Sequence, residues 1–178
     1  LYEKRVFSLT SRMCRNSADA EEAAQEAFLA AWQALPAFRG DASFATWLYR
    51  LVSNACVDIL RREGRHQAMA GPSLDDEESS PEPPDKSPSP HALAERAELR
   101  RQIEAGLAAL PPEYRQVLIL REIHQCTYDE IAQICSIDLG TVKSRINRGR
   151  KRLRKILLES GNFSAAGASK KTEKEGCR

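Results

Sequence analysis

The chain has 178 residues and a formal net charge of only +2, because 27 Lys and Arg are set against 25 Asp and Glu. No apolar run approaches the roughly 18 to 20 residues of a membrane-spanning helix, and residues 1–5 lead into no signal-peptide core. The 42% of hydrophobic residues suffices for folded cores. We expect a soluble, cytoplasmic protein, and the initial Leu1 is consistent with a missing N-terminal piece.

The small net charge conceals a strong asymmetry along the chain. Residues 1–66 carry a net +1, residues 67–98 carry −6, residues 99–138 carry −2 and residues 139–178 carry +9. An acidic middle and a basic end are typical of a solvating linker beside a nucleic-acid contact surface.

Proline and acidic residues divide the chain into two parts. Residues 71–90 hold six of the nine prolines and the acidic run 75–78, with almost nothing apolar to bury. No strand pattern competes with helical spacing elsewhere, so we predict an all-α fold of two small helical domains. We place the domains at residues 1–66 and 93–159, joined by a disordered acidic, proline-rich linker at 67–92 and followed by a disordered basic tail at 160–178.

Apolar spacing in the first domain predicts helices over residues 2–13, 19–35 and 44–62. Asp19 and Glu22 fit a capping box at the start of the second helix, and Pro36 ends it. The predicted buried face of this helix consists of Ala20, Ala24, Ala27, Phe28, Ala31 and Leu35.

The second domain is predicted to contain helices over residues 93–110, 113–123, 127–134 and 139–158. The last two, separated by a short break, fit a helix-turn-helix motif, with the small Ala132 where the helices cross. Ser136 stands in the turn, where Gly is frequent.

The last predicted helix combines an apolar stripe with a basic surface. The stripe consists of Val142, Ile146, Gly149, Leu153 and Leu157, and eight cations lie on the other faces at Lys143, Arg145, Arg148, Arg150, Lys151, Arg152, Arg154 and Lys155. A solvated helix face is the alternative explanation. Because eight like charges in thirteen residues repel one another, the preceding helix-turn pattern favours an anionic partner such as DNA.

Four sequence blocks resemble the extracytoplasmic-function (ECF) group of bacterial RNA polymerase sigma factors, and the resemblance spans about residues 1–158. The blocks are DAEEAAQEAF at 19–28, FRGDASFATWL at 38–48, LPPEYRQVL at 110–118 and GTVKSR at 140–145. The resemblance implies that the two domains are sigma regions 2 and 4, and that the chain directs promoter-specific transcription initiation in response to an extracytoplasmic or stress signal.

The resemblance also implies partners and site residues. Glu22, Gln25 and Glu26 are expected to bind core polymerase at the β′ clamp helices, although Glu22 could instead only cap its helix. Region 4 is expected to reach the β flap. Residues expected to melt and read the minus-ten promoter element are Phe38, Arg39, Asp41, Ser43, Asn54, Arg61 and Arg62. Phe44 and Trp47 fit the apolar stripe better than a base-stacking role.

The helix-turn-helix is expected to bind the minus-thirty-five element. The residues concerned are Lys143, Ser144, Asn147 and Arg148 at the bases, and Arg145, Arg150, Arg152 and Arg154 at phosphates. An anti-sigma factor is a further expected partner. The rival hypothesis is a stand-alone helix-turn-helix regulator whose first domain senses a ligand or dimerises.

No catalytic, metal or cofactor site is expected, nor a small-molecule substrate. The five cysteines, at 14, 56, 126, 135 and 177, have no zinc-binding spacing, and the three histidines are scattered. Cys56 and Cys135 are expected to be buried hydrophobes, and a redox switch through Cys126 and Cys135 is the alternative. RNA synthesis would then belong to the polymerase.

Overall fold

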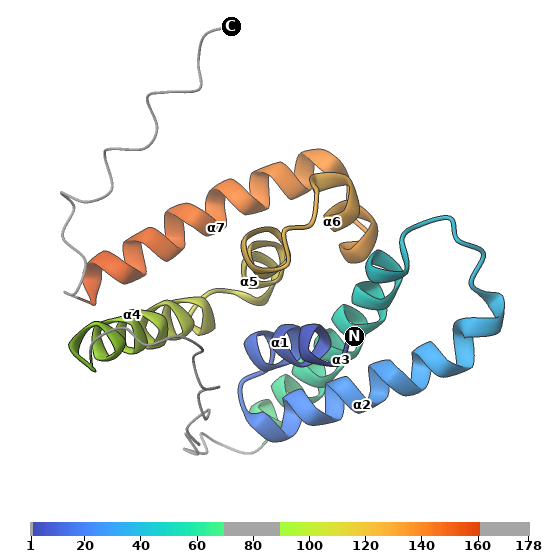
Figure 1. The fold of residues 1–178 in the computed structure, drawn as a ribbon, viewed down its shortest axis with the longest axis horizontal. Helices are drawn as coiled ribbons and strands as arrows, with labels where there is room; N and C mark the ends of the chain where they lie inside the picture. The colour runs from blue at the N-terminus through green and yellow to red at the C-terminus, as the bar shows by residue number, and fades with distance from the viewer. Residues whose placement is uncertain (1, 70–89, 161–178) are drawn as a thin grey trace, which may run out of the picture.

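The computed structural model describes residues 2–69 and 90–160, and every regular element within them is helical. The predicted all-α fold is therefore confirmed. Figure 1 shows the first three helices on one side of the molecule and the last four on the other. Most of the predicted linker and all but the first residue of the predicted tail lie outside the described residues.

The first half contains α1 (Glu3–Met13), α2 (Ser17–Ala34), a 3₁₀ turn η1 (Leu35–Ala37) and α3 (Phe44–Met69). The predicted capping box of Asp19 and Glu22 is wrong. The N-cap residue of α2 is Asn16, whose side chain accepts a hydrogen bond from the backbone N–H of Asp19 at 2.8 Å. The helix therefore begins two residues earlier than predicted, because Asn competes well for the N-cap position.

The buried face of α2 is narrower than predicted. Ala20, Ala23 and Ala27 pack against the core, which lets the helix approach α1 and α3 closely. Phe28 and Leu35, which were predicted to be buried, are 40% and 46% exposed. Because the alanines of α2 face the core, its larger apolar side chains lie towards solvent.

The second half contains α4 (Pro90–Ala108), α5 (Pro112–Leu118), a π-helical turn η2 (Ile119–Ile123), α6 (Tyr128–Cys135) and α7 (Leu139–Glu159). The ranges of α3 and α4 show that both helices extend into the region predicted as linker. Pro112 occupies the first turn of α5, as predicted.

The predicted helix-turn-helix is formed by α6 and α7. A capping box of Thr127 and Glu130 starts α6, and Asp138 caps α7 through a 2.8 Å bond from the backbone N–H of Thr141. Between the helices, Ser136 adopts the left-handed conformation (φ 53°) that normally favours Gly. The turn therefore keeps its usual backbone shape without glycine.

Small residues let α7 pack closely against α4 and α5. A Cβ added to Gly149 would lie 3.1 Å from the side chain of Leu118, and one added to Gly106 would lie 3.0 Å from Leu153. Val142 and Ile146 of α7 are buried as well. The predicted apolar stripe of the last helix thus faces the core, and its basic faces point outwards.

The two halves pack directly against each other, α1 lying beside α4 and α3 beside α6. The buried guanidinium of Arg115 in α5 donates to the carbonyl of Met13 at the end of α1 (3.0 Å), and also to the carbonyls of Leu110 and Ala108. The hydroxyl of Thr46 in α3 donates to Glu130 at the start of α6 (3.3 Å). One continuous core therefore joins both halves.

Candidate nucleic-acid interface

The outer face of α7 presents unpaired polar groups. Lys143, Asn147 and Arg148 are exposed, and no other described residue forms a hydrogen bond or ion pair with them. The Ser144 hydroxyl donates to the Thr141 carbonyl within the helix at 3.1 Å. Cationic and amide groups on an exposed helix suit the major groove, where they can donate to base edges and phosphates.

Two of the expected phosphate-binding cations on α7 already have partners within the chain. Arg150 donates twice to one carboxylate oxygen of Glu122 in η2, at 2.9 and 2.6 Å. Arg152 lies over the ring of Tyr114 in α5, 4.9 Å from its centroid. These contacts hold the guanidinium of Arg150 against η2 and that of Arg152 against α5.

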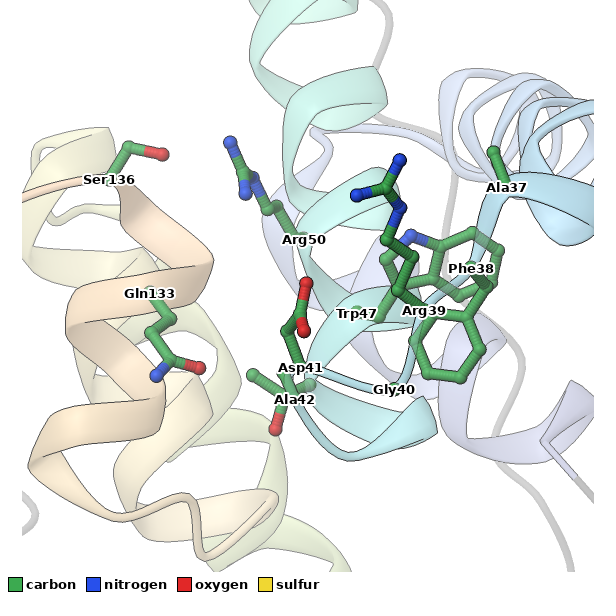
Figure 2. Close-up of a pocket in the computed structure, with 11 residues that line it drawn as sticks. Ala37, Phe38, Arg39, Gly40, Asp41, Ala42, Trp47, Arg50, Gln133 and Ser136 are labelled. Carbon is green, nitrogen blue, oxygen red and sulfur yellow. The ribbon is translucent and has the colours of Figure 1, made fainter.

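The loop between η1 and α3 lines a cavity of 570 Å³. Of the residues expected at the minus-ten element, Phe38, Arg39 and Asp41 line it, together with Arg50, whose role the sequence did not suggest. Figure 2 shows Gln133 of α6 and Ser136, which directly follows α6, on the opposite wall. The cavity therefore lies between the loop before α3 and the end of α6.

Four aromatic rings support this loop. Phe38 lies 5.9 Å from Phe44 and 5.0 Å from Trp47 between ring centroids, and Tyr2 lies 5.2 Å from Phe44. Phe44 and Trp47 are partly buried against the core, in agreement with the prediction from the apolar stripe. Trp47 also borders the cavity, so one ring belongs to both the core and the site.

The other expected minus-ten residues lie outside the cavity. Ser43 accepts a bond from the backbone N–H of Thr46 (3.1 Å) and so caps the first turn of α3. Asn54 is exposed further along α3, and Arg61 is paired with Asp58 at 3.5 Å. The structure thus groups these residues on α3 and the loop before it.

Arg62 connects the expected minus-ten residues to the expected polymerase-binding residues. Its Nη2 atom lies 3.0 Å from Oε1 of both Glu22 and Glu26 on α2. All three side chains are about half exposed. Gln25 is exposed on the same helix.

The outer surface of α2 also carries apolar side chains that the sequence reasoning missed. Leu29 is 59% exposed and Trp32 is 77% exposed. Leu29 and Trp32 follow Glu22 and Glu26 at helical spacing, and this spacing could have predicted that they share the exposed face of α2. Exposed aromatic and apolar side chains beside charged groups are typical of protein-binding surfaces.

A histidine occupies the contact between the two halves. The His124 ring lies 5.0 Å from the ring of Tyr49 in α3, and its Nε2 atom is buried without a partner in the described part of the chain. Burial, followed by the charges of Arg12 and Arg5, lowers the pKa of His124 to about 4. The imidazole is therefore neutral near pH 7.

The thiols described by the structure are free and largely buried. Cys56 is fully buried, as predicted, while Cys135 is half-buried. Burial raises the pKa of Cys126 to about 11 and that of Cys135 to about 12. Such thiols are protonated at neutral pH and react slowly, which does not favour the alternative of a redox switch through this pair.

Residues 2–69 and 90–160 contain neither a metal-binding cluster nor a membrane-spanning helix. No group of three or more His, Cys, Asp or Glu side chains there could hold a metal ion. No helix in the same ranges has the length and apolar content required to cross a membrane.

Comparison with known proteins assigns each half to a family. The model described as Sigma-70 region 2 matches residues 1–66, and the model described as Sigma-70 region 4 matches residues 100–153. The chain is 36% identical to the RNA polymerase sigma-H factor of Pseudomonas aeruginosa, covering 88% of this chain and 82% of that protein. It is also 36% identical to the ECF sigma-E factor of Escherichia coli K12, covering 84% and 79%.

A third relative is longer. The chain is 34% identical to the ECF sigma factor SigE of Mycolicibacterium smegmatis over 92% of this chain, and it spans 62% of that protein's length.

Solved structures share the fold. The sigma factor RpoE of Bartonella quintana, in complex with the anti-sigma factor NepR, aligns with a TM-score of 0.72 at 20% identity, covering 88% of this chain and 91% of that one. CnrH, in complex with the cytosolic domain of CnrY, aligns with a TM-score of 0.59 at 24% identity, covering 90% and 84%.

A helix-turn-helix half packed against a second helical half defines a two-part, all-α DNA-binding class of protein. With both region models matched in this order, the chain belongs to the ECF family of RNA polymerase sigma factors.

Proposed function

We propose that the chain binds core RNA polymerase and directs it to promoters with minus-ten and minus-thirty-five elements. The observation that carries this proposal is the pairing of two surfaces in one chain: the unpaired outer face of α7 and the loop cavity before α3. RNA synthesis itself belongs to the polymerase, and the chain acts in the cytoplasm.

The outer face of α7 is proposed to read the minus-thirty-five element in the major groove. The exposed, unpaired state of Lys143, Asn147 and Arg148 supports base contacts by these residues, with Ser144 beside them. Arg145 is half-buried, and Arg150 and Arg152 have intramolecular partners. We assign these three arginines to phosphate contacts, for which fixed positions are an advantage.

The loop before α3 is proposed to bind an unstacked base of the minus-ten element with the side chains that it presents to the cavity. Phe38 offers a ring face, while Arg39 and Asp41 offer a donor and an acceptor for base edges. Asn54, Arg61 and Arg62 follow along α3 and would contact the strand beyond. Ser43 holds the first turn of α3 in place for this contact.

The arrangement of the two halves suggests how the free chain is kept from DNA. Gln133 of α6 and Ser136 just after it form the wall of the cavity opposite the loop. We propose that α6 must move away before a DNA strand can bind the loop. We propose that polymerase binding separates the halves. We also propose, as the family resemblance implies, that an anti-sigma factor stabilises the inactive chain.

The exposed surface of α2 is proposed to dock on the polymerase through Glu22, Gln25 and Glu26, with Leu29 and Trp32 supplying apolar contact. Glu26→Lys reverses one of these charges on an exposed side chain and should weaken binding to core polymerase at least about tenfold. Labelled chain titrated with core enzyme measures this affinity.

Glu21→Lys is the matched control, since Glu21 is a neighbouring exposed carboxylate on α2 outside the proposed contact. It should change the affinity much less than Glu26→Lys. Equal affinities of wild type and the Glu26→Lys variant, with both folded by circular dichroism, would remove this residue from the interface.

A further inference from the structure

Three side chains at the crossing of α2 and α3 form a charge cluster with a net charge of −1. We propose that Glu22 and Glu26 act as an internal substitute for DNA phosphate, occupying Arg62 until core polymerase binds the two carboxylates and releases the guanidinium for DNA. This inference rests on the proposed function and adds a coupling between its two binding surfaces.

The geometry of the cluster resembles phosphate binding. Glu22 and Glu26 lie one helical turn apart on α2, and a single guanidinium nitrogen of Arg62 is 3.0 Å from an oxygen of each. A bound phosphate also supplies anionic oxygens within hydrogen-bonding distance of a guanidinium group, usually to two nitrogens rather than one. Because like charges at this helical spacing repel, Arg62 stabilises the pair in the free chain.

The neighbouring arginine shows that this arrangement is specific to Arg62. Arg61 is paired within α3 to Asp58 at 3.5 Å, and both side chains are about two-thirds exposed or more. No ion pair between Arg61 and α2 is present in the described residues. The two adjacent cations therefore face different anions, and only Arg62 links α3 to the proposed polymerase-binding surface.

Electrostatics makes the two uses of Arg62 compete. A phosphate that approaches Arg62 in the free chain comes close to two carboxylates, and their repulsion offsets the attraction of the guanidinium. Basic groups of the polymerase that neutralise Glu22 and Glu26 remove this repulsion. By linkage, DNA bound at Arg62 must favour polymerase binding by the same factor.

A mutant cycle without polymerase tests whether the carboxylates hold Arg62. The probe is labelled single-stranded DNA of random sequence, and binding to the full chain is measured by fluorescence anisotropy. The Glu22→Gln/Glu26→Gln double change is made in wild type, in Arg62→Ala and in Arg61→Ala. Contacts of α7 with the probe are common to all variants and cancel in the affinity ratios.

We expect the double change to tighten DNA binding about two- to fivefold in wild type and in Arg61→Ala, but not in Arg62→Ala. The same tightening in Arg62→Ala would mean that the carboxylates repel DNA in general, and no tightening in wild type would mean that they do not mask Arg62. Either result overturns the inference.

Core polymerase provides the second arm. In the absence of DNA, Arg62→Ala should bind core enzyme about two- to fivefold more tightly than wild type, because the internal competitor for the carboxylates is gone. Weaker binding would contradict the release step. If wild type fails to bind core enzyme at all, the proposed function and the release step fail together, whereas the DNA affinity ratios still decide whether Arg62 is masked.

Discussion

Individual cations on α7 differ in what surrounds them, and this difference predicts different roles. Arg148 is exposed on α7, directly after Asn147. Like Lys143 and Asn147, it has no partner among the described residues. Arg154 is exposed two turns further along, near the end of the helix. Side chains near the start of a recognition helix contact base edges, whereas those beyond contact the backbone.

Arg148→Ala should therefore weaken the free energy of binding to the preferred minus-thirty-five duplex by about 1 to 3 kcal/mol. The affinity ratio between this duplex and random DNA should fall as well. Arg154→Ala should weaken binding to preferred and to random DNA by the same factor. It should also lower the slope of log affinity against log salt concentration by about 1, the amount expected for one lost phosphate contact. Competition binding by the polymerase-bound chain measures both. An equal loss of discrimination in the two variants would contradict this division of roles.

At the scale of elements, Arg115 joins three helices through one side chain. It lies in α5, is 5% exposed, and donates to carbonyls at the ends of α4 and α1. Burial, and then the charge of Arg15, lowers the pKa of its guanidinium below the ordinary value of an arginine. Its loss would leave three carbonyl groups without this donor, two of them in buried contacts.

Arg115→Ala should lower the free energy of unfolding by about 3 kcal/mol, because buried acceptors are left unsatisfied. Arg101→Ala serves as the control, since Arg101 is 74% exposed and paired to Glu98 one turn away in α4. This change should cost less than about 0.5 kcal/mol. Urea unfolding measures both values, and similar losses would show that the buried guanidinium is not a structural link.

Local chemistry made the helices predictable, whereas packing between them did not. Pro36 and Pro112 stop or start helices through their own covalent geometry, so the predicted breaks next to them agree with the structure. The predicted N-cap of α2 was wrong because Asn16 and Asp19 are both good capping residues, and only the fold decides which of them caps the helix.

The sites divide in the same way. The helix-turn-helix and its basic outer face follow from spacing within one segment of the chain. The pair of Arg62 and Glu26 joins residues 36 apart, and the cavity wall adds α6 to a loop nearly 100 residues earlier. Such contacts depend on how α2 crosses α3 and how α6 faces α3, which periodicity along the sequence does not determine.

At the scale of the whole molecule, a neutral histidine lies where the halves meet. His124 contacts Tyr49 of α3, with Arg5 and Arg12 of α1 as the nearby charges. Burial raises the pKa of Tyr49, so this ring also stays neutral. A proton on His124 would be buried beside two cations, which disfavours the packed arrangement.

The packed form should therefore open in acid. A solvated His124 has the ordinary pKa of 6.5, and the packed one about 4. The stability that neutral His124 contributes is thus complete above pH 6.5 and is lost as the pH falls towards 4. Small-angle scattering of wild type should show an expansion as the pH falls from about 6.5 towards about 4.

His124→Gln is the matched variant and should largely remove the expansion. The comparison is needed because Glu63 also titrates: its hydrogen bond with Asp19 raises its pKa to about 7. An expansion of equal size in both proteins would assign the effect to other groups.

The proposed function requires that this chain give core RNA polymerase its promoter specificity. Transcription in vitro from a library of templates, with core polymerase alone and with the chain added, measures this dependence. We expect RNA starts that need the chain and lie downstream of a shared pair of sequence elements. If no template gives a start that depends on the chain, while the chain alone binds duplex DNA tightly, the protein is a stand-alone helix-turn-helix regulator instead.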